Sequence, residues 1–506
     1  MGSSSPGSLA CVFQVLDRGD AESYQNVSFS LGTRSVEAKL TGDALCGLEV
    51  LGSAASCRLV LLAPESLAVQ LAGSPEEAVE LVADWGRLSM ELESGVRRLT
   101  RYAGSVEVEV LPSTGFYRTE GGVVEFRGAG RGDVELAVLH ALAGKLPPIS
   151  GTGEPCNVAV DISTGHNLYV AAVVRGLRAA IVAYKLAHLD HALLDGRWPG
   201  ARFWVASSPP VYRDSQYSYP IHLEEVDARI FLSFPLPQQD VVSGRVKPEA
   251  MVGPGQLSDR EKASLGRRWG RLFANLRRVL RVGLYMHNAL RYNTPLALYY
   301  AERVYRLPGP EEPLELAGRL AVFVKSEGWR STKVERTERG IAVSHRGVER
   351  RLALYTLLAL LETAALLRLR QRLLDDVDLE RGVPVGELRE KFEKLIYRPR
   401  DEQLAQDLAL NRRMLSRDLD EIERRAASLR PGSSALLEEL LEGSERQKGG
   451  GGGSGESDVK RNFFAHSGFY RGFTEAYRSS EGELLLRYRD DEAAVSSLRM
   501  WLQDPS

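Results

Sequence analysis

The N-terminal part of the chain alternates short apolar runs with longer segments of helical periodicity. Five runs are rich in Val, Leu, Ile and Phe and have the length of buried strands: Ala10–Leu16, Arg58–Ala63, Val106–Leu111, Asn157–Ile162 and Phe203–Ala206. Three segments between them carry apolar residues at helical spacing: Pro75–Arg101, Asp133–Ala143 and Leu168–Leu194. Such alternation predicts an α/β domain over residues 8–215, with a parallel Rossmann-like sheet flanked by helices. Ligands of such sheets bind beyond the carboxyl ends of the strands.

The pattern becomes helical in the second half of the chain. Residues 216–256 are rich in Pro, Ser and Gln and are expected to form a connector. Long amphipathic segments then predict a helical region over 257–310 and 350–506, with a β-hairpin-like insertion over 311–349. One segment of this region carries an apolar stripe at three- and four-residue spacing, formed by Leu265, Trp269, Leu272, Leu276 and Val279. Arg267, Arg271 and Arg278 lie on a neighbouring face, which is expected to be a solvated helix surface.

Composition and charge restrict the class of protein. A chain of 506 residues is long enough for two or three domains. Its formal net charge of −2 means that any nucleic-acid site must be a local patch. The four cysteines form no Cys-x-x-Cys pair, so a zinc or redox motif is not expected, and Cys11 and Cys156 are predicted to be buried thiols.

No membrane segment is predicted. Residues 1–8 lack the apolar stretch of a signal peptide, and the most apolar helix, Leu352–Leu367, contains Glu362 and is short for a bilayer. The protein is therefore expected to be soluble and cytoplasmic.

The strongest chemical signal is the segment Arg461-Asn462-Phe463-Phe464-Ala465-His466 near the C-terminus. Arg offers a permanent charge and a planar donor fork for phosphate, and His exchanges protons near neutral pH. Five positions on a straight helix turn through roughly 140°, so the two side chains do not share a face. This spacing favours a composite site in which two chains each present an Arg and a His to one RNA strand. The alternative is a structural Arg and His near a helix end.

A second signal is the segment Asp161–Asn167, which joins a predicted strand to a long helix. Hydroxyls, a glycine and exposed amides at a helix N-terminus can hold an anion. The alternative is an ordinary strand-to-helix turn capped by Ser163 or Thr164. The candidate ligand-binding residues of this segment are Asp161, Ser163, Thr164, Gly165, His166 and Asn167.

Both segments resemble one known protein family. The Arg461–His466 segment, with Ser467-Gly468 after it, resembles the Arg-x4-His signature of HEPN ribonucleases, which build their site from two protomers. Residues 161–167 resemble the Asp-x-Thr-x-Gly-x-Asn segment of CARF domains, although Ser stands where the family usually has Thr, and Thr and His flank the glycine. Tyr24–Ser30 and Leu61–Leu67 look like the N-terminal segments of the same family. The resemblance is to the CARF–HEPN ribonucleases of type III CRISPR systems.

The resemblance implies a metal-independent endoribonuclease that cuts single-stranded RNA. The RNA 2′-hydroxyl would attack its own phosphate, with His466 as general acid or base and Arg461 offsetting charge on the phosphoryl oxygens. Asn462 would orient a hydroxyl or the Arg461 side chain. No metal or cofactor is implied. Cyclic tetra-adenylate or hexa-adenylate, with the tetra-adenylate preferred, would bind a homodimer or a dimer-based higher oligomer and activate it in antiviral defence. Asp17, Gly19 and Ser66, in the other N-terminal loops, are further candidates for that ligand pocket.

Residues 404–423 offer a rival interpretation. Within 381–430, two short amphipathic pieces carrying Arg412, Arg413 and Arg417 could form a helix-turn-helix of a ligand-sensing DNA regulator. Four acidic residues in the second piece and the lack of a glycine at the turn favour a structural helical insertion, so DNA is not the expected partner. A third possibility is a HEPN module that binds RNA without cutting it.

Three other segments carry weaker signals. His188 and His191 have metal-like spacing but no third ligand, so a helix surface is expected. Gly128–Gly132 lacks a full dinucleotide fingerprint, and no P-loop lysine motif occurs. The glycine run Gly449–Gly453, just before Arg461, is expected to be a flexible tether.

Overall fold

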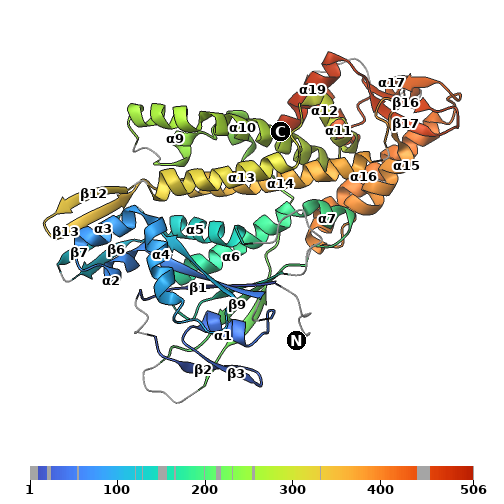
Figure 1. Cartoon of the computed structure of the whole chain (residues 1–506). Coiled ribbons are helices and arrows are strands. Elements are labelled where there is room, and N and C mark those ends of the chain that lie inside the picture. Colours follow the sequence, from blue (N-terminus) through green and yellow to red (C-terminus); the bar gives the residue numbers. More distant parts are fainter. Residues whose placement is uncertain are drawn as a thin grey trace.

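The computed structural model shows an elongated molecule in which the N-terminal part is built on a large sheet and the C-terminal part is mainly helical with a smaller sheet (Figure 1). It describes residues 9–19, 24–53, 56–119, 121–127, 129–145, 156–164, 167–198, 200–211, 218–230, 232–253, 257–330, 332–375, 377–441 and 456–504. Gly128, Gly165, His166 and the glycine run 449–453 lie outside the described residues.

A six-stranded sheet forms the core of the N-terminal part. Its order is β11-β9-β8-β1-β4-β5, and all neighbours are parallel except β11 and β9. The strands are β1 (Leu9–Val15), β4 (Cys57–Pro64), β5 (Ser105–Leu111), β8 (Cys156–Asp161), β9 (Arg202–Ser207) and β11 (His222–Val226). The first five match the five predicted strands, so the Rossmann-like fold class is confirmed. β11 was not predicted, because its residues alternate only weakly and lie in the expected connector.

Helices cover this sheet, but two predicted helices are each divided. Pro75–Arg101 contains α3 (Pro75–Ala83) and α4 (Trp85–Val96), because Asp84 accepts hydrogen bonds from the Gly86 and Arg87 amides and starts a new helix. Leu168–Leu194 contains α6 (Asn167–Ala187) and α7 (Leu189–Leu194). α5 (Arg131–Ala143) packs on α6 between the sheet and the helical part (Figure 1). The remaining helices here are α1 (Thr41–Gly47), α2 (Ala68–Leu71) and the 3₁₀ turn Glu65–Leu67.

Two smaller sheets flank the main one. β2 (Val27–Leu31) pairs with β3 (Arg34–Ala38) and with β10 (Tyr219–Pro220). The second sheet has the order β12-β13-β7-β6 and joins distant parts of the chain. Its strands are β6 (Gly115–Thr119), β7 (Gly122–Arg127), β12 (Thr332–Thr337) and β13 (Gly340–His345). The hairpin predicted within 311–349 is therefore present, and it completes a sheet of the N-terminal part by pairing β13 with β7. The first half of that predicted insertion, residues 311–329, is wrong, because its apolar residues recur at helical spacing and it forms helix.

Three long helices form the centre of the molecule: α10 (Asp259–Arg291), α13 (Glu311–Phe323) and α14 (Arg350–Leu374). α10 and α14 cross closely at Gly283, where an added Cβ would lie 1.9 Å from Thr363 Oγ1, so no larger residue fits without movement. A π-helical segment, Val324–Trp329, follows α13. α14 is the one helix among the described residues that is long and apolar enough to cross a membrane, but 78% of its apolar window is buried, as in a core helix.

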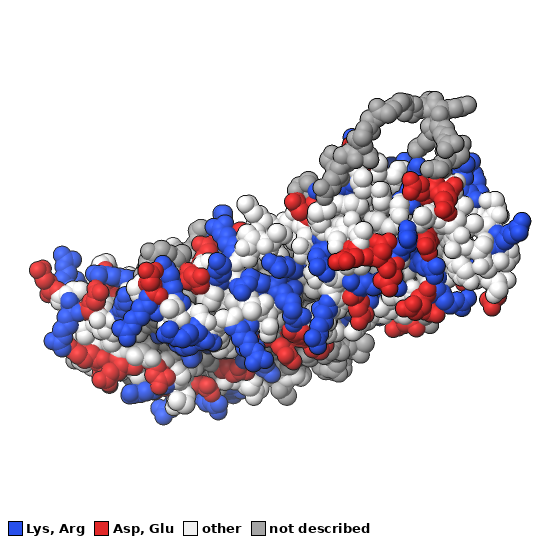
Figure 2. Space-filling model, turned by 90° about the horizontal axis from the view of Figure 1, so that it is seen from above, with Lys and Arg blue, Asp and Glu red and all other residues white. Residues whose placement is uncertain are grey.

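The outer face of α10 is basic. Arg267, Arg271 and Arg278 are all exposed there, as predicted for a solvated helix surface. Figure 2 views this side of the molecule and shows many Lys and Arg side chains on it.

The C-terminal part combines helices with a small antiparallel sheet. The sheet has the order β14-β17-β16-β15 and was not anticipated from the sequence. Its strands are β14 (Val383–Pro384), β15 (Ser434–Leu436), β16 (Thr474–Arg478) and β17 (Leu484–Tyr488). The helices here and in the connector are α8 (Gln238–Val242), α9 (Pro248–Met251), α11 (Pro295–Tyr299), α12 (Ala301–Val304), α15 (Val385–Leu388), a π-helical segment (Arg389–Ile396), α16 (Glu402–Ala426), α17 (Leu437–Leu441), α18 (Glu456–Ala465) and α19 (Glu492–Gln503).

The possible helix-turn-helix within 381–430 is wrong. Residues 402–426 form one uninterrupted helix, α16. Its buried positions, among them Leu404, Leu408, Leu415, Leu419 and Ile422, continue at helical spacing through the place where a turn would be. The DNA-binding alternative therefore loses the element on which it depended.

The four cysteines divide into a bonded pair and two free thiols. Cys46 in α1 and Cys57 at the start of β4 form a disulfide that the sequence analysis did not predict. Cys11 and Cys156 are buried and free, as expected.

Candidate functional site

His466 follows the last residue of α18, where the chain reverses sharply. Ser467 and Gly468 both have left-handed backbone conformations, with φ of 53° and 77°. The Gly468 amide donates to the Phe463 carbonyl at 2.9 Å, which closes the helix end. An added Cβ at Gly468 would lie 2.7 Å from Cβ of Thr294, so glycine is required both by the backbone and by the close approach.

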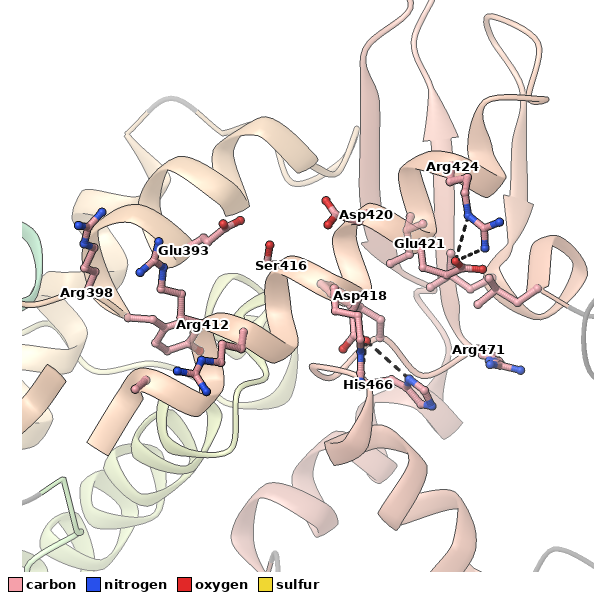
Figure 3. A pocket seen from close by; sticks show the side chains of 18 of the residues that line it. Glu393, Arg398, Arg412, Ser416, Asp418, Asp420, Glu421, Arg424, His466 and Arg471 are labelled. Carbon is pink, nitrogen blue, oxygen red and sulfur yellow. Dashed lines mark hydrogen bonds and ion pairs between the residues drawn. The ribbon is translucent and has the colours of Figure 1, made fainter. Parts of the chain in front are cut away.

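A buried carboxylate lies beside the His466 imidazole. Asp418 of α16 is 8% exposed, and its Oδ2 accepts the Ser467 hydroxyl at 2.6 Å. Asn293, at the end of α10, donates to the same Ser467 hydroxyl at 2.8 Å. His466 Nδ1 lies 3.8 Å from Asp418 Oδ1 (Figure 3). Three separate elements therefore fix the backbone next to His466 and place a negative charge close to its ring.

Asp418 is a residue whose place in the site the sequence reasoning missed. In the sequence, Asp418 is distinguished only as one of the four acidic residues within 404–423 that disfavour DNA binding. The 48 positions between Asp418 and His466 and the unpredicted fold between them left no spacing signal to join the two.

His466 opens onto a cavity of about 1100 Å³ between α16, the Arg389–Ile396 segment and the residues after α18. Its side chain is 42% exposed, so it can reach a ligand in the cavity. Figure 3 shows Asp418 and His466 in the middle of this space, with arginines on both sides. The arrangement can supply an imidazole for proton transfer and guanidinium groups for an anion.

Arg461 and Asn462 lie elsewhere on α18. Both are exposed, and neither lines the cavity. No described residue forms an ion pair or side-chain hydrogen bond with Arg461. The single chain therefore does not bring Arg461 and His466 into one site, in keeping with the angular separation expected from their spacing.

The described residues contain no group of three or more His, Cys, Asp or Glu side chains that could hold a metal ion. His188 is buried, and its Nδ1 lies 2.8 Å from the Tyr184 carbonyl. His191 contacts Asp195 on the helix surface. The helix-surface position expected for both is therefore confirmed for His191 and wrong for His188, which is buried against the carbonyl of the preceding turn.

The predicted ligand loops meet at one edge of the main sheet. Asp17 and Gly19 follow β1, and Ser66 follows β4. Asp161 is the last residue of β8, and residues 162–164 follow it. These three strands are parallel, with β1 between β8 and β4. Side chains also join the loops: Thr164 donates to the Val15 carbonyl at 2.9 Å.

The individual loop residues differ in how they are held. Asp17 is exposed and accepts the Tyr24 hydroxyl at 2.6 Å, and the Gly19 amide donates to Gln70 at 2.7 Å. Ser66 is buried, and its amide donates to the Ser113 hydroxyl. Asn167 is exposed at the start of α6.

Asp161 is the most unusual group of this edge. It is fully buried, accepts hydrogen bonds from the Ser163 amide and hydroxyl, and leaves Oδ2 without a partner among the described residues. Burial raises its pKa from 3.8 to about 6, and the two Ser163 hydrogen bonds only partly oppose the shift.

This raised pKa predicts a pH-dependent stability. The folded chain holds the Asp161 proton more tightly than the unfolded chain does, so the favourable contribution is complete below about pH 4 and is lost as pH rises through about 6. In Asp161→Asn this loss is absent. Thermal unfolding midpoints at several pH values between 4 and 7 should therefore fall more steeply in the wild type than in Asp161→Asn. Parallel curves for the two proteins would contradict the prediction.

Comparison with known proteins gives two family matches. Residues 11–197 match the model described as "CRISPR system endoribonuclease Csx1, CARF domain", and residues 408–490 match "CRISPR system endoribonuclease Csx1, HEPN domain". No curated protein matches the chain significantly. The two matched ranges cover more than half of the chain and contain the sheet edge, His466 and most of the residues that line its cavity. The chain belongs to the CRISPR-associated CARF–HEPN ribonucleases.

Proposed function

We propose that this protein is a metal-independent endoribonuclease that cuts single-stranded RNA when a cyclic oligoadenylate, preferably the tetra-adenylate, binds its CARF domain. Type III CRISPR antiviral defence in the cytoplasm is the proposed setting. The observation that carries the proposal is the exposed His466 imidazole, which lies within the HEPN range beside a buried carboxylate and opens onto an arginine-lined cavity.

The proposed reaction uses the RNA as its own nucleophile. A 2′-hydroxyl loses its proton and attacks the adjacent phosphorus, so that a 2′-O–P bond forms and the P–O5′ bond breaks. The products are a 2′,3′-cyclic phosphate and a free 5′-hydroxyl. An imidazole can take the first proton or deliver one to the leaving oxygen, and a guanidinium offsets the charge that builds on the phosphoryl oxygens.

A homodimer supplies what one chain lacks. Arg461 is exposed and unpaired among the described residues, yet it lies outside the cavity that His466 lines. A second chain packed against α18 could bring its own Arg461 to this His466, and an isologous contact would create the reciprocal pair as well. Asn462, exposed next to Arg461, would orient the phosphate or the guanidinium.

The CARF loops are proposed to bind the ring across the same twofold axis. A ring of identical adenylates can offer equivalent groups to equivalent loops of two chains. Activation then depends on how much more tightly the ring binds the cutting-competent arrangement than the resting one. Asp161, Ser163, Thr164 and the loop residues Asp17, Gly19 and Ser66 are the proposed contacts, with Gly165, His166 and Asn167 from the matching motif.

A nuclease time course tests the proposal. Labelled single-stranded RNA is incubated with the purified chain alone and with tri-, tetra- or hexa-adenylate rings, with and without a chelator. Cutting is expected to accelerate with the tetra-adenylate ring and to survive the chelator. Equal cutting rates with and without every cyclic oligoadenylate would contradict the proposed sensor role of the CARF domain. Cutting that stops with the chelator would contradict the metal-independent mechanism.

A further inference from the structure

The wall of the His466 cavity contains arginines that no described residue neutralises. Arg412 and Arg413 of α16 and Arg398 before it line the cavity, and none of the three forms an ion pair or side-chain hydrogen bond with a described residue. Arg413 and Arg398 are exposed, and Arg412 is partly exposed. Unpaired guanidinium groups facing one cavity favour binding of an anion there.

The acidic residues of the same cavity are already paired. Glu393 and Asp420 both contact Arg389, at 3.1 and 2.5 Å. Glu421 pairs with Arg424 and Arg425. Asp418 accepts the Ser467 hydroxyl and lies 3.2 Å from Arg417. The carboxylates therefore do not cancel the three free guanidinium groups.

The resulting charge contrasts with that of the whole chain. Six arginines and four acidic residues line the cavity, an excess of two positive charges, whereas the complete sequence has a formal net charge of −2. A local positive cavity in a slightly acidic protein concentrates a polyanion at that place.

The free arginines are also positioned for a ligand longer than the reacting group. Arg412 and Arg413 precede Asp418 by six and five residues on one continuous helix, which is roughly 7–9 Å along its axis. Figure 3 shows Arg398 and Arg412 together on one side of the cavity, away from His466. A chain of phosphates can span this separation, whereas a single phosphate at His466 cannot.

Resting on the proposed function, we infer that Arg398, Arg412 and Arg413 form a subsite for the RNA backbone on one side of the bond that is cut. The subsite binds phosphates of flanking nucleotides and carries no base readout, because the aromatic side chains of the cavity, Tyr397 and Phe469, are 1% and 2% exposed and cannot stack on bases.

Binding is measured with the full-length chain in a His466→Ala background, so that RNA is not consumed. The probe is a labelled single-stranded RNA of mixed sequence. The test variant adds Arg412→Gln and Arg413→Gln, and the matched control adds Arg267→Gln and Arg271→Gln, two exposed and unpaired arginines of α10 outside the cavity. Both doubles remove two positive charges, so they separate a local contact from a change in net charge.

The test variant is expected to bind RNA roughly 5- to 30-fold more weakly than its parent. The slope of log Kd against log salt should flatten by about 1.4, since each phosphate contact to a single strand contributes about 0.7. Replacing Arg412 and Arg413 by Lys should restore most of the slope, which excludes misfolding as the cause. The control double should leave both quantities unchanged.

Three results would overturn the subsite. The first is an unchanged Kd and salt slope in the test variant, and the second is an equal loss of RNA affinity in the control. The third is an altered oligomeric state of the test variant in size-exclusion chromatography, which would make the cavity an interface between chains. Cutting by the wild-type chain is scored in a separate assay. Failure of the nuclease proposal therefore shows itself there, and failure of the subsite shows itself in binding.

Discussion

His466→Ala is expected to lower the rate of RNA cutting by roughly 10²–10⁴, the usual contribution of a general acid or base. The imidazole is 42% exposed at the cavity, and its backbone is fixed by the Ser467–Asp418 hydrogen bond rather than by the ring itself. Loss of the imidazole should therefore leave the fold and RNA binding intact. Single-turnover rates of RNA cutting, measured with saturating cyclic tetra-adenylate and saturating enzyme, compare the variant with the wild type.

Arg461→Ala provides the companion measurement, with an expected loss of roughly 10²–10³ if its guanidinium stabilises the phosphoryl charge. Mixing the two inactive proteins tests the composite site. In a mixed dimer one chain offers an intact Arg461 and its partner an intact His466, so part of the activity should return. A wild-type rate in His466→Ala would end the catalytic assignment, and a mixture that stays inactive would argue against one Arg and one His acting across the interface.

Five strands of the main sheet and the edge that holds the candidate ligand loops could be predicted from the sequence, because both depend on local patterns; the strand order could not. Each of β1, β4, β5, β8 and β9 is a short apolar run, and buried parallel strands must be apolar on both faces. Since parallel strands end at one edge, the loops at Asp17, Ser66 and Asp161 were expected to meet, and they do.

Features that depend on distant pairing were not predictable in this way. β11 is mostly exposed or partly exposed and carries two adjacent glutamates, so its pattern did not indicate a strand. The β13–β7 pairing joins residues more than 200 positions apart. Asp418 was visible as a charge on an amphipathic helix, but only the packing of α16 against the end of α18 places it beside His466.

A buried ion pair connects the CARF domain to the segment that precedes α14, and its loss is expected to lower the stability of the fold strongly. Glu65, after β4, and His345, at the end of β13, have fully buried side chains, and Nε2 of the imidazole lies 2.6 Å from Glu65 Oε1. The same carboxylate accepts the Ser113 amide and the Trp85 indole N–H. Since Ser66 is next to Glu65 and α14 begins five residues after His345, this pair ties the ligand edge to the central helices.

His345→Ala is expected to cost about 3–5 kcal/mol of unfolding free energy, because it leaves the Glu65 charge buried without its partner. For a domain of about 200 residues this corresponds to a drop of roughly 6–20 °C in the midpoint of thermal unfolding. The control is Arg87→Ala, which removes an exposed pair with Glu91 and should cost less than about 1 kcal/mol. Similar midpoints for the two variants would show that the buried pair contributes no more than a surface pair.

The pH dependence of the same pair gives an independent check. Burial lowers the pKa of His345, but the nearby Glu65 carboxylate outweighs burial, and the net shift is upward from 6.5. A raised histidine pKa means that the folded chain holds the proton more tightly, so the stabilisation is complete below about pH 6.5 and is lost as pH rises through the folded value. The difference in unfolding midpoint between the wild type and Glu65→Gln/His345→Gln should therefore shrink from pH 6 towards alkaline pH. A difference that grows with pH would mean that His345 is buried in its neutral form, and this connection would then be held by a neutral hydrogen bond rather than by an ion pair.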